Sequence, residues 1–173
     1  MVNSTRRIGL GAIFGVMILA VNGFIPAPTS DFLIVFQSFF LALSFLVLGK
    51  GGATYVGVVS GVLITVVKLS FFPLDLVFSI MFGVAVDLLA TAFRARENGR
   101  ASSLRLIACM MVSTGVVGFV AYYVTAVLTE LVPDDFFLDL TVLIFGVVSG
   151  AIGGAIAGRL WNRNLMSRFA GSQ

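Results

Sequence analysis

Five polar side chains lie within or at the ends of otherwise apolar segments and could together bind a small molecule. They are Asn22, Gln37, Lys68, Tyr122 and Glu130. Polar and ionisable groups are costly inside a membrane, so they face the interior of a helix bundle or a cavity. An ammonium group among amides and a phenol is suited to bind a carboxylate or phosphate through charge-assisted hydrogen bonds. We therefore predict a substrate-binding pocket formed by these five residues.

Each of these side chains also has a simpler interpretation. Lys68 could extend to the membrane surface or pair with Asp75 across the turn at Pro73. The amides and the phenol could anchor the interface or join two helices by hydrogen bonds. Asp87 lies toward the other end of its apolar segment, where we expect it to pair with an arginine such as Arg94. If Lys68 does contact a ligand, its charge favours an anionic one.

The chain offers little for catalysis or for metal binding. Histidine is absent and Cys109 is the single cysteine, so neither an intramolecular disulfide nor a His/Cys metal cluster can form. The sequence contains no G-x-S-x-G, no H-E-x-x-H and no phosphate-binding glycine loop. We expect no enzyme activity, no catalytic residues, no metal and no cofactor.

The amino-acid composition indicates whether these residues lie in water or in a membrane. Of the 173 residues, 59% are hydrophobic and 11% are charged, and the mean hydropathy is +1.10. Soluble domains carry roughly 25% charged residues. This difference excludes a soluble globular protein, a disordered chain and a nucleic-acid-binding module. It predicts an integral membrane protein, with residues 1–173 forming one membrane domain.

Six apolar segments are long enough to be transmembrane helices, which need about 20 mostly apolar residues. Proline- and glycine-rich breaks and one hydrophilic loop, Arg94–Arg105, separate them. No alternation of period two indicates a barrel. We predict an all-α, six-transmembrane-helix bundle with approximate spans Ile8–Ile25, Phe32–Leu48, Gly51–Phe72, Leu74–Phe93, Leu106–Thr129 and Leu138–Leu160.

The distribution of charge predicts how this bundle is oriented. One side of a six-span arrangement holds ten of the eleven basic residues: Arg6, Arg7, Lys50, Arg94, Arg96, Arg100, Arg105, Arg159, Arg163 and Arg168. The other side holds the acidic residues Asp31, Asp75, Glu130, Asp134, Asp135 and Asp139. Basic flanks stay in the cytoplasm. We expect a multi-pass protein of the cell (plasma) membrane with both termini cytoplasmic.

Small residues recur at four-residue spacing, which lets helices approach closely in lipid. The last segment carries the longest series, Gly146, Gly150, Gly154 and Gly158, and shorter pairs are Gly57 with Gly61 and Gly11 with Gly15. Packing within one bundle accounts for such stripes. The alternative is that one stripe docks a partner subunit, and Gly11 with Gly15 is the better candidate because it lies next to the basic N-terminus.

The order of these features resembles that of the substrate-binding S components of energy-coupling factor (ECF) transporters, which are small six-helix vitamin-uptake proteins. Helix order, helix length and loop character carry the resemblance over most of the chain. The segments that carry it are Gly11-Ala12-Ile13-Phe14-Gly15, Pro26-Ala27-Pro28, Leu46-Val47-Leu48-Gly49, Phe72-Pro73-Leu74, Phe82-Gly83-Val84-Ala85-Val86-Asp87-Leu88 and Arg159-Leu160-Trp161-Asn162-Arg163.

The resemblance implies a pocket near the outer face for a small vitamin-like substrate. It also implies three partner subunits in the lipid bilayer and cytoplasm, a transmembrane coupling protein and two cytoplasmic ATPases, which reorient the S component to release substrate inward. No nucleic acid is implied. In this family small residues of the first helix, usually two alanines four residues apart, dock the coupling protein. Gly11 and Gly15 match that position, with glycine replacing alanine.

Two other functions stay open at this point. A non-transporting membrane scaffold of the MreD-like type has a similar pattern of spans and needs no polar pocket. A membrane enzyme acting on lipid-linked substrates could use Asp75, Asp134 and Asp135 with a divalent metal, although their spacing is not that of metal ligands. The polar residues around Lys68 favour solute binding over scaffolding.

Overall fold

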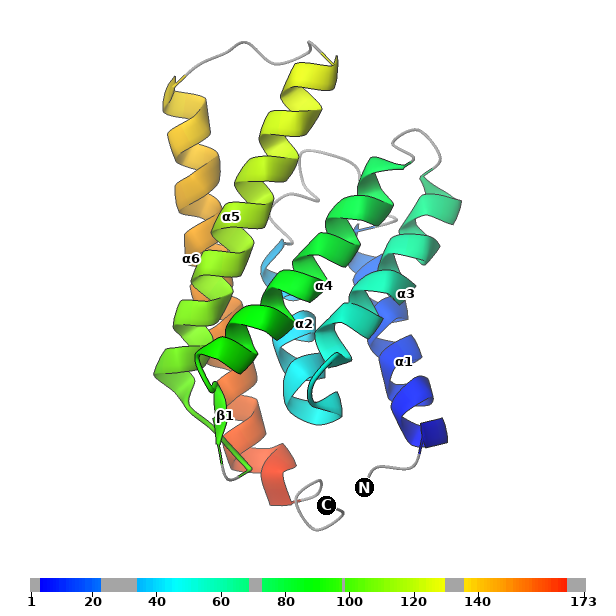
Figure 1. Cartoon of the computed structure of the whole chain (residues 1–173), viewed down its shortest axis with the longest axis vertical. Coiled ribbons are helices and arrows are strands. Elements are labelled where there is room, and N and C mark those ends of the chain that lie inside the picture. The colour runs from blue at the N-terminus through cyan, green and yellow to red at the C-terminus, as the bar shows by residue number, and fades with distance from the viewer. Residues whose placement is uncertain (1–3, 23–33, 69–72, 98, 130–135, 168–173) are drawn as a thin grey trace.

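The computed structural model describes residues 4–22, 34–68, 73–97, 99–129 and 136–167, and in this part the chain is almost entirely helical. It forms six α-helices, a two-stranded hairpin and a terminal π-helical turn (Figure 1). Their bounds are α1 Ser4–Asn22, α2 Ile34–Leu48, α3 Gly52–Val67, α4 Leu74–Ala92, β1 Arg96–Glu97, β2 Arg100–Ala101, α5 Ser103–Thr129, α6 Phe136–Leu160 and η3 Trp161–Leu165. The prediction of an all-α bundle is confirmed.

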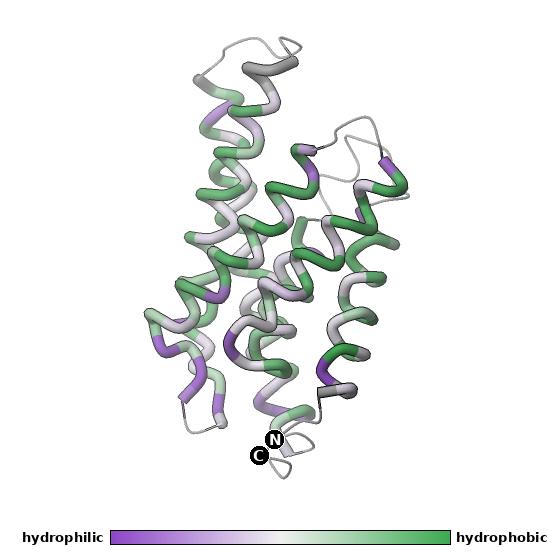
Figure 2. The backbone as a smooth tube through the Cα atoms, turned by 45° about the vertical axis from the view of Figure 1, so that its right-hand side comes forward, coloured by the Kyte–Doolittle hydropathy of each residue, from purple (hydrophilic) through white to green (hydrophobic). Residues whose placement is uncertain are grey.

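The surface and length of the helices support a membrane protein. Three stretches, Leu74–Ala92, Ser103–Thr125 and Phe137–Leu165, are long and apolar enough to cross a membrane, and α1 to α3 contribute shorter apolar helices. Large apolar side chains are exposed along the bundle, including Leu104 at 81% and Val66 at 70%. Figure 2 shows hydrophobic residues along the helices and hydrophilic ones mostly near their ends. Water would not tolerate so much exposed apolar surface, whereas lipid does.

Successive helices run in alternating directions, and α2 lies at the centre of the bundle. Helix α2 contacts α1, α3, α4, α5 and α6, and most of its side chains are buried from Ser38 to Leu48. A helix that is apolar on all sides, as α2 is, belongs in such a buried position. The N-terminus of α1, the α2–α3 turn, the hairpin and the end of α6 lie at one end of the bundle, which we call the basic end (Figure 1). The opposite end is called the Lys68 end.

Glycines let the helices approach one another, as the four-residue spacing predicts. A Cβ at Gly150 would overlap the Met110 carbonyl oxygen of α5, and one at Gly83 would lie 2.5 Å from the Ala53 oxygen of α3. Gly57 faces the Ser79 carbonyl of α4 just as closely. These stripes are therefore used for packing within the chain, in agreement with the simpler of the two interpretations.

The helix ends differ from the predicted spans in two informative places. Helix α3 ends at Val67, where a span to Phe72 was expected, so Lys68 follows the helix as its C-cap instead of lying within it. The loop Arg94–Arg105 contains the antiparallel hairpin, with Arg96 opposite Ala101 and Glu97 opposite Arg100. Gly99 has a φ of +79° between the two strands, which glycine adopts without strain.

Candidate solute site at the Lys68 end

Three of the five predicted binding residues meet where three helices end or begin. Asn22 is the last residue of α1, Gln37 lies in the first turn of α2, and Lys68 caps α3. The Asn22 side-chain amide donates to the Gln37 side-chain oxygen at 3.0 Å. The Lys68 ammonium donates to the Asn22 backbone carbonyl at 2.6 Å. The structure thus brings Asn22, Gln37 and Lys68 together as one polar group, which we call the Lys68 group.

The position of Lys68 follows from local backbone geometry. Its φ of −115° and ψ of 74° end α3, and its own N–H still donates to the Ile64 carbonyl at 2.7 Å. The side chain then reaches the C-terminal carbonyl of α1, where the helix dipole favours a cation. No ion pair within 4.0 Å joins Lys68 to Asp75, although both residues belong to the described part of the chain. A direct Lys68–Asp75 ion pair is therefore not formed, although the charge of Lys68 still acts on the Asp75 carboxylate.

The Lys68 group keeps capacity to bind something further. An ammonium group has three donors and a side-chain amide has two donors and an acceptor, and Lys68 uses one of its donors in the described structure. One turn earlier on α3, the Thr65 hydroxyl is buried and has no hydrogen-bond partner within the described residues. Thr65 was missed by the sequence analysis because a lone threonine in an apolar run carries no signal.

Of the other two predicted binding residues, the structure describes only Tyr122, which makes no hydrogen bond to this group. Tyr122 lies half-buried on α5, and its neighbour Tyr123 is exposed and stacks on Phe119 with ring centroids 6.5 Å apart. The hydrogen bonds of the Lys68 group run among its own three members. Glu130 lies outside the described residues. Two of the five predicted contacts therefore stay predictions.

Both predicted docking glycines are buried against α3. A Cβ at Gly11 would overlap the ring of Tyr55, and one at Gly15 would lie 2.6 Å from a methyl carbon of Val59. The space that these glycines leave is thus occupied within the chain. The lipid-facing side of α1 instead presents Ile13, Val16 and other exposed apolar residues. Docking of a partner subunit through Gly11 and Gly15 stays a prediction.

At the basic end, Arg96 joins the hairpin to α2 and to Trp161, and the sequence does not indicate these contacts. Its guanidinium donates to the Leu46 carbonyl in the last turn of α2 at 2.8 Å and lies 5.0 Å from the ring centroid of Trp161. Burial lowers the pKa of Arg96 from its ordinary value. Trp161 donates in turn to the Gly99 carbonyl at 2.9 Å. The hairpin is thereby fixed to both α2 and the end of α6.

Asp87 has a different partner from the one expected. Its carboxylate accepts hydrogen bonds from the backbone N–H of Thr54 at 2.7 Å and the hydroxyl of Thr54 at 2.6 Å, and more weakly from the N–H of Ala53 at 3.4 Å. Asp87 therefore caps the N-terminus of α3 from the neighbouring helix, and pairing with Arg94 is wrong. A helix N-terminus attracts a carboxylate because it has free N–H donors and is the positive end of the helix dipole.

The described residues indicate binding chemistry at the Lys68 end. No three His, Cys, Asp or Glu side chains among them gather to hold a metal ion. The ammonium of Lys68 and the amides of Asn22 and Gln37 can orient a small polar solute. Comparisons with known protein families, with curated protein sequences and with solved structures find no match to the chain.

Proposed function

We propose that the chain is the substrate-binding S component of an ECF-type importer, with a small anionic, vitamin-like solute bound at the Lys68 end. The observation that carries this proposal is the Lys68 group, in which a cation and two amides from three neighbouring elements meet, half-buried, at one end of an apolar bundle. A scaffold that works through helix faces needs no such group. Its free donors suit a carboxylate or phosphate better than a neutral solute.

The distribution of charge supports a six-span topology with the Lys68 end outside the cell. Eight described basic residues lie in or beside the parts of the elements that meet at the basic end (Figure 1): Arg7, Lys50, Arg94, Arg96, Arg100, Arg105, Arg159 and Arg163. Asp75 and Asp139 lie in the first turns of α4 and α6, toward the Lys68 end. By the positive-inside rule the basic end is cytoplasmic. Both termini are then inside, and the solute is captured from outside.

Delivery to the cytoplasm requires partners, because the chain contains no motif for ATP binding. In this proposal a transmembrane coupling protein and two cytoplasmic ATPases reorient the S component in the plasma membrane. The exposed side of α1, with Ile13 and Val16, is the part of that helix free to contact another subunit. Gly11 and Gly15 would then act indirectly, by setting how closely α1 lies against α3.

The test is solute binding by the purified protein and its Lys68→Ala variant. Native mass spectrometry first reveals any solute that copurifies. Thermal shift and equilibrium binding then compare anionic vitamins such as biotin, pantothenate and folate with neutral riboflavin and cationic thiamine. Loss of one charge-assisted hydrogen bond, about 1.5–3 kcal/mol, weakens binding roughly tenfold or more. We expect that loss for an anionic ligand and an unchanged fold.

Arg163→Ala is the control, because it removes an exposed cation at the opposite end of the bundle. We expect it to leave solute affinity unchanged. Equal solute affinities in the wild type and in both variants would show that Lys68 does not contact the solute and serves only as a helix cap. An absence of bound solute, together with stable copurification of other membrane proteins, would favour the MreD-like scaffold instead.

A further inference from the structure

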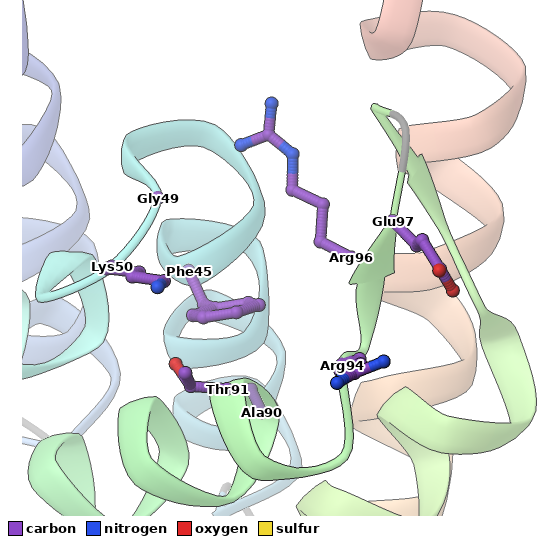
Figure 3. Close-up of a pocket in the computed structure, with 8 residues that line it drawn as sticks. All are labelled: Phe45, Gly49, Lys50, Ala90, Thr91, Arg94, Arg96 and Glu97. Atoms are coloured by element: carbon purple, nitrogen blue, oxygen red, sulfur yellow. The ribbon is translucent and has the colours of Figure 1, made fainter.

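A cavity of about 500 Å³ opens at the basic end, away from the Lys68 group. It lies between the C-terminal ends of α2 and α4 and the hairpin (Figure 3). Its lining residues are Phe45, Gly49, Lys50, Ala90, Thr91, Arg94, Arg96 and Glu97. Phe45 and Ala90 belong to apolar helices, whereas the charged residues belong to the connections that follow them. The cavity therefore lies where the apolar part of the bundle meets its polar boundary.

The charge of this cavity is strongly positive. Three cationic side chains, Lys50, Arg94 and Arg96, line it. The one carboxylate, that of Glu97, is already paired with Arg105 at 3.2 Å. Figure 3 shows Glu97 directed to the opposite side of its strand from Arg96. The cavity thus has no counter-ion of its own for Lys50 and Arg94.

Lys50 and Arg94 are not needed to satisfy the helix ends around them. The Leu46 carbonyl of α2 accepts a hydrogen bond from Arg96. The carbonyls of Ala90 and Thr91 in α4 accept from the backbone N–H groups of Ala95 and Arg94. Neither the Lys50 ammonium nor the Arg94 guanidinium has a hydrogen bond or an ion pair within the described residues. Capping of helix C-termini therefore does not account for these two cations.

The backbone nevertheless holds both cations beside the cavity. Lys50 lies between Gly49 and Gly51, whose φ angles of +79° and +80° make the tight turn from α2 to α3. Arg94 itself has a φ of +49°, a conformation that residues other than glycine seldom adopt. The hairpin that follows Arg94 is fixed by Trp161 and by two hydrogen bonds between Asn162 and Ala101.

We propose that this cavity binds a phosphate group, presented by the headgroup of an anionic phospholipid or as free phosphate. Two unpaired cations and the Thr91 hydroxyl supply the donors that phosphate oxygens require. Basic pockets between helices at the membrane boundary are typical sites for anionic headgroups. Phe45 and Ala90 close the inner side of the cavity but are themselves buried, at 4% and 0% exposed, so the phosphate group is the part of either ligand that the cavity can recognise. The site is independent of the function proposed for the Lys68 end.

The experiment measures binding of phosphatidylglycerol to the detergent-purified full chain by native mass spectrometry and thermal unfolding. Phosphatidylcholine serves as the lipid of no net charge, and inorganic phosphate as the free anion. The test variant combines Lys50→Gln with Arg94→Asn, because asparagine tolerates the positive φ at that position. The matched control combines Arg100→Gln with Arg163→Gln, which removes two exposed charges at the same end but outside the cavity.

We expect phosphatidylglycerol to bind the wild type and the control alike, and to bind the test variant at least tenfold more weakly. If inorganic phosphate, and not phosphatidylglycerol, binds the wild type and the control and binds the test variant more weakly, the phosphate site is supported and free phosphate is its occupant. Equal loss in both double variants would overturn the proposal, since net charge alone would then explain binding. Absence of stabilisation by either phosphate source would overturn it as well. Thr91→Val, which removes a donor and no charge, provides a second variant, with a weaker loss of a few-fold expected.

Discussion

A cationic side chain reaches the C-terminus of a neighbouring helix at both ends of the bundle, but the two are held differently. At the basic end Arg96 donates to Leu46 of α2 and also stacks on Trp161, within a hairpin that is itself hydrogen-bonded to the end of α6. At the Lys68 end, Lys68 reaches the last carbonyl of α1 through one hydrogen bond. The contact between Arg96 and α2 is therefore supported by neighbouring elements, whereas the contact between Lys68 and α1 depends on one flexible side chain.

This difference suggests which end can change. Arginine is planar and holds its partners in a fixed geometry, whereas lysine is a mobile point charge on a flexible stem. Lys68 can bind a ligand oxygen with its remaining donors while it keeps the hydrogen bond to the Asn22 carbonyl. Releasing Arg96 would instead leave the Leu46 carbonyl without its donor and remove the hydrogen bond that joins the hairpin to α2. We therefore expect stability to depend mainly on the basic end and binding of a solute on the Lys68 end.

The largest expected effect on stability comes from Asp87→Ala at the basic end. The change leaves the N-terminal N–H groups of α3 without their carboxylate partner in a buried place. Hydrogen bonds to a charged group contribute about 1.5–3 kcal/mol, so we expect the free energy of unfolding to fall by about 3 kcal/mol. Chemical denaturation in mild detergent, followed by helical circular dichroism, measures it.

Asp139→Ala is the control for this prediction. Asp139 is a half-buried carboxylate in the first turn of α6, and it makes no hydrogen bond or ion pair within the described residues. Its loss should cost less than about 1 kcal/mol, the usual contribution of a charge near a helix N-terminus. Equal losses in the two variants would mean that the cap on α3 contributes nothing special.

A somewhat smaller loss of stability is expected for Arg96→Ala. The variant loses the bond to Leu46 and the contact with Trp161, and we expect the free energy of unfolding to fall by about 2 kcal/mol. Arg96→Lys keeps the charge but not the planar group and should recover only part of the loss. The same denaturation measurement applies, with exposed Arg100→Ala as the control. A full recovery by lysine would show that charge, and not geometry, fixes the hairpin.

The smallest stability effect, and the one that reaches the Lys68 end, is expected for Gly15→Ala. The added methyl group would lie 2.6 Å from a methyl carbon of Val59, so α1 must move away from α3. We expect a loss of about 1 kcal/mol and weaker solute binding, because Asn22 at the end of α1 moves relative to Lys68. Gly9→Ala, which meets nothing within 4 Å, should leave both quantities unchanged or slightly improved. Solute binding that survives Gly15→Ala would separate the packing of α1 from the site.

The sequence predicts the helices well because each depends mainly on its own residues. Apolar length locates α2, α4 and α6 to within a few residues, and the spacing of glycines such as Gly150 and Gly154 predicts close contact between helices. The meeting of Asn22, Gln37 and Lys68 is also foreseen in outline, since all three lie near one depth of their segments. These features follow from local composition and from the alternation of direction.

Other features depend on contacts between distant residues, and the sequence does not reveal them. Asp87 is separated from Thr54 by 33 residues, and nothing in either segment indicates that one caps the other. Trp161 lies 62 residues beyond Gly99, so the docked hairpin looks like an ordinary hydrophilic loop. The cavity at the basic end was hidden for a related reason. In the sequence, Lys50 and Arg94 indicate only the orientation of the chain in the membrane, because the cavity that they share forms only on folding.

The unequal lengths of the helices have a consequence for the surrounding lipid. At a rise of 1.5 Å per residue, the 15 residues of α2 span about 22 Å, and the 27 residues of α5 span about 40 Å. The hydrocarbon layer of a bilayer is about 30 Å thick. Helices α5 and α6 are longer than that layer, and the other helices are shorter. Such a bundle would tilt, or the bilayer would be thicker on one side of the bundle than on the other. Bilayer thickness would then favour one inclination of the bundle over another, and thinner or thicker membranes should shift that preference.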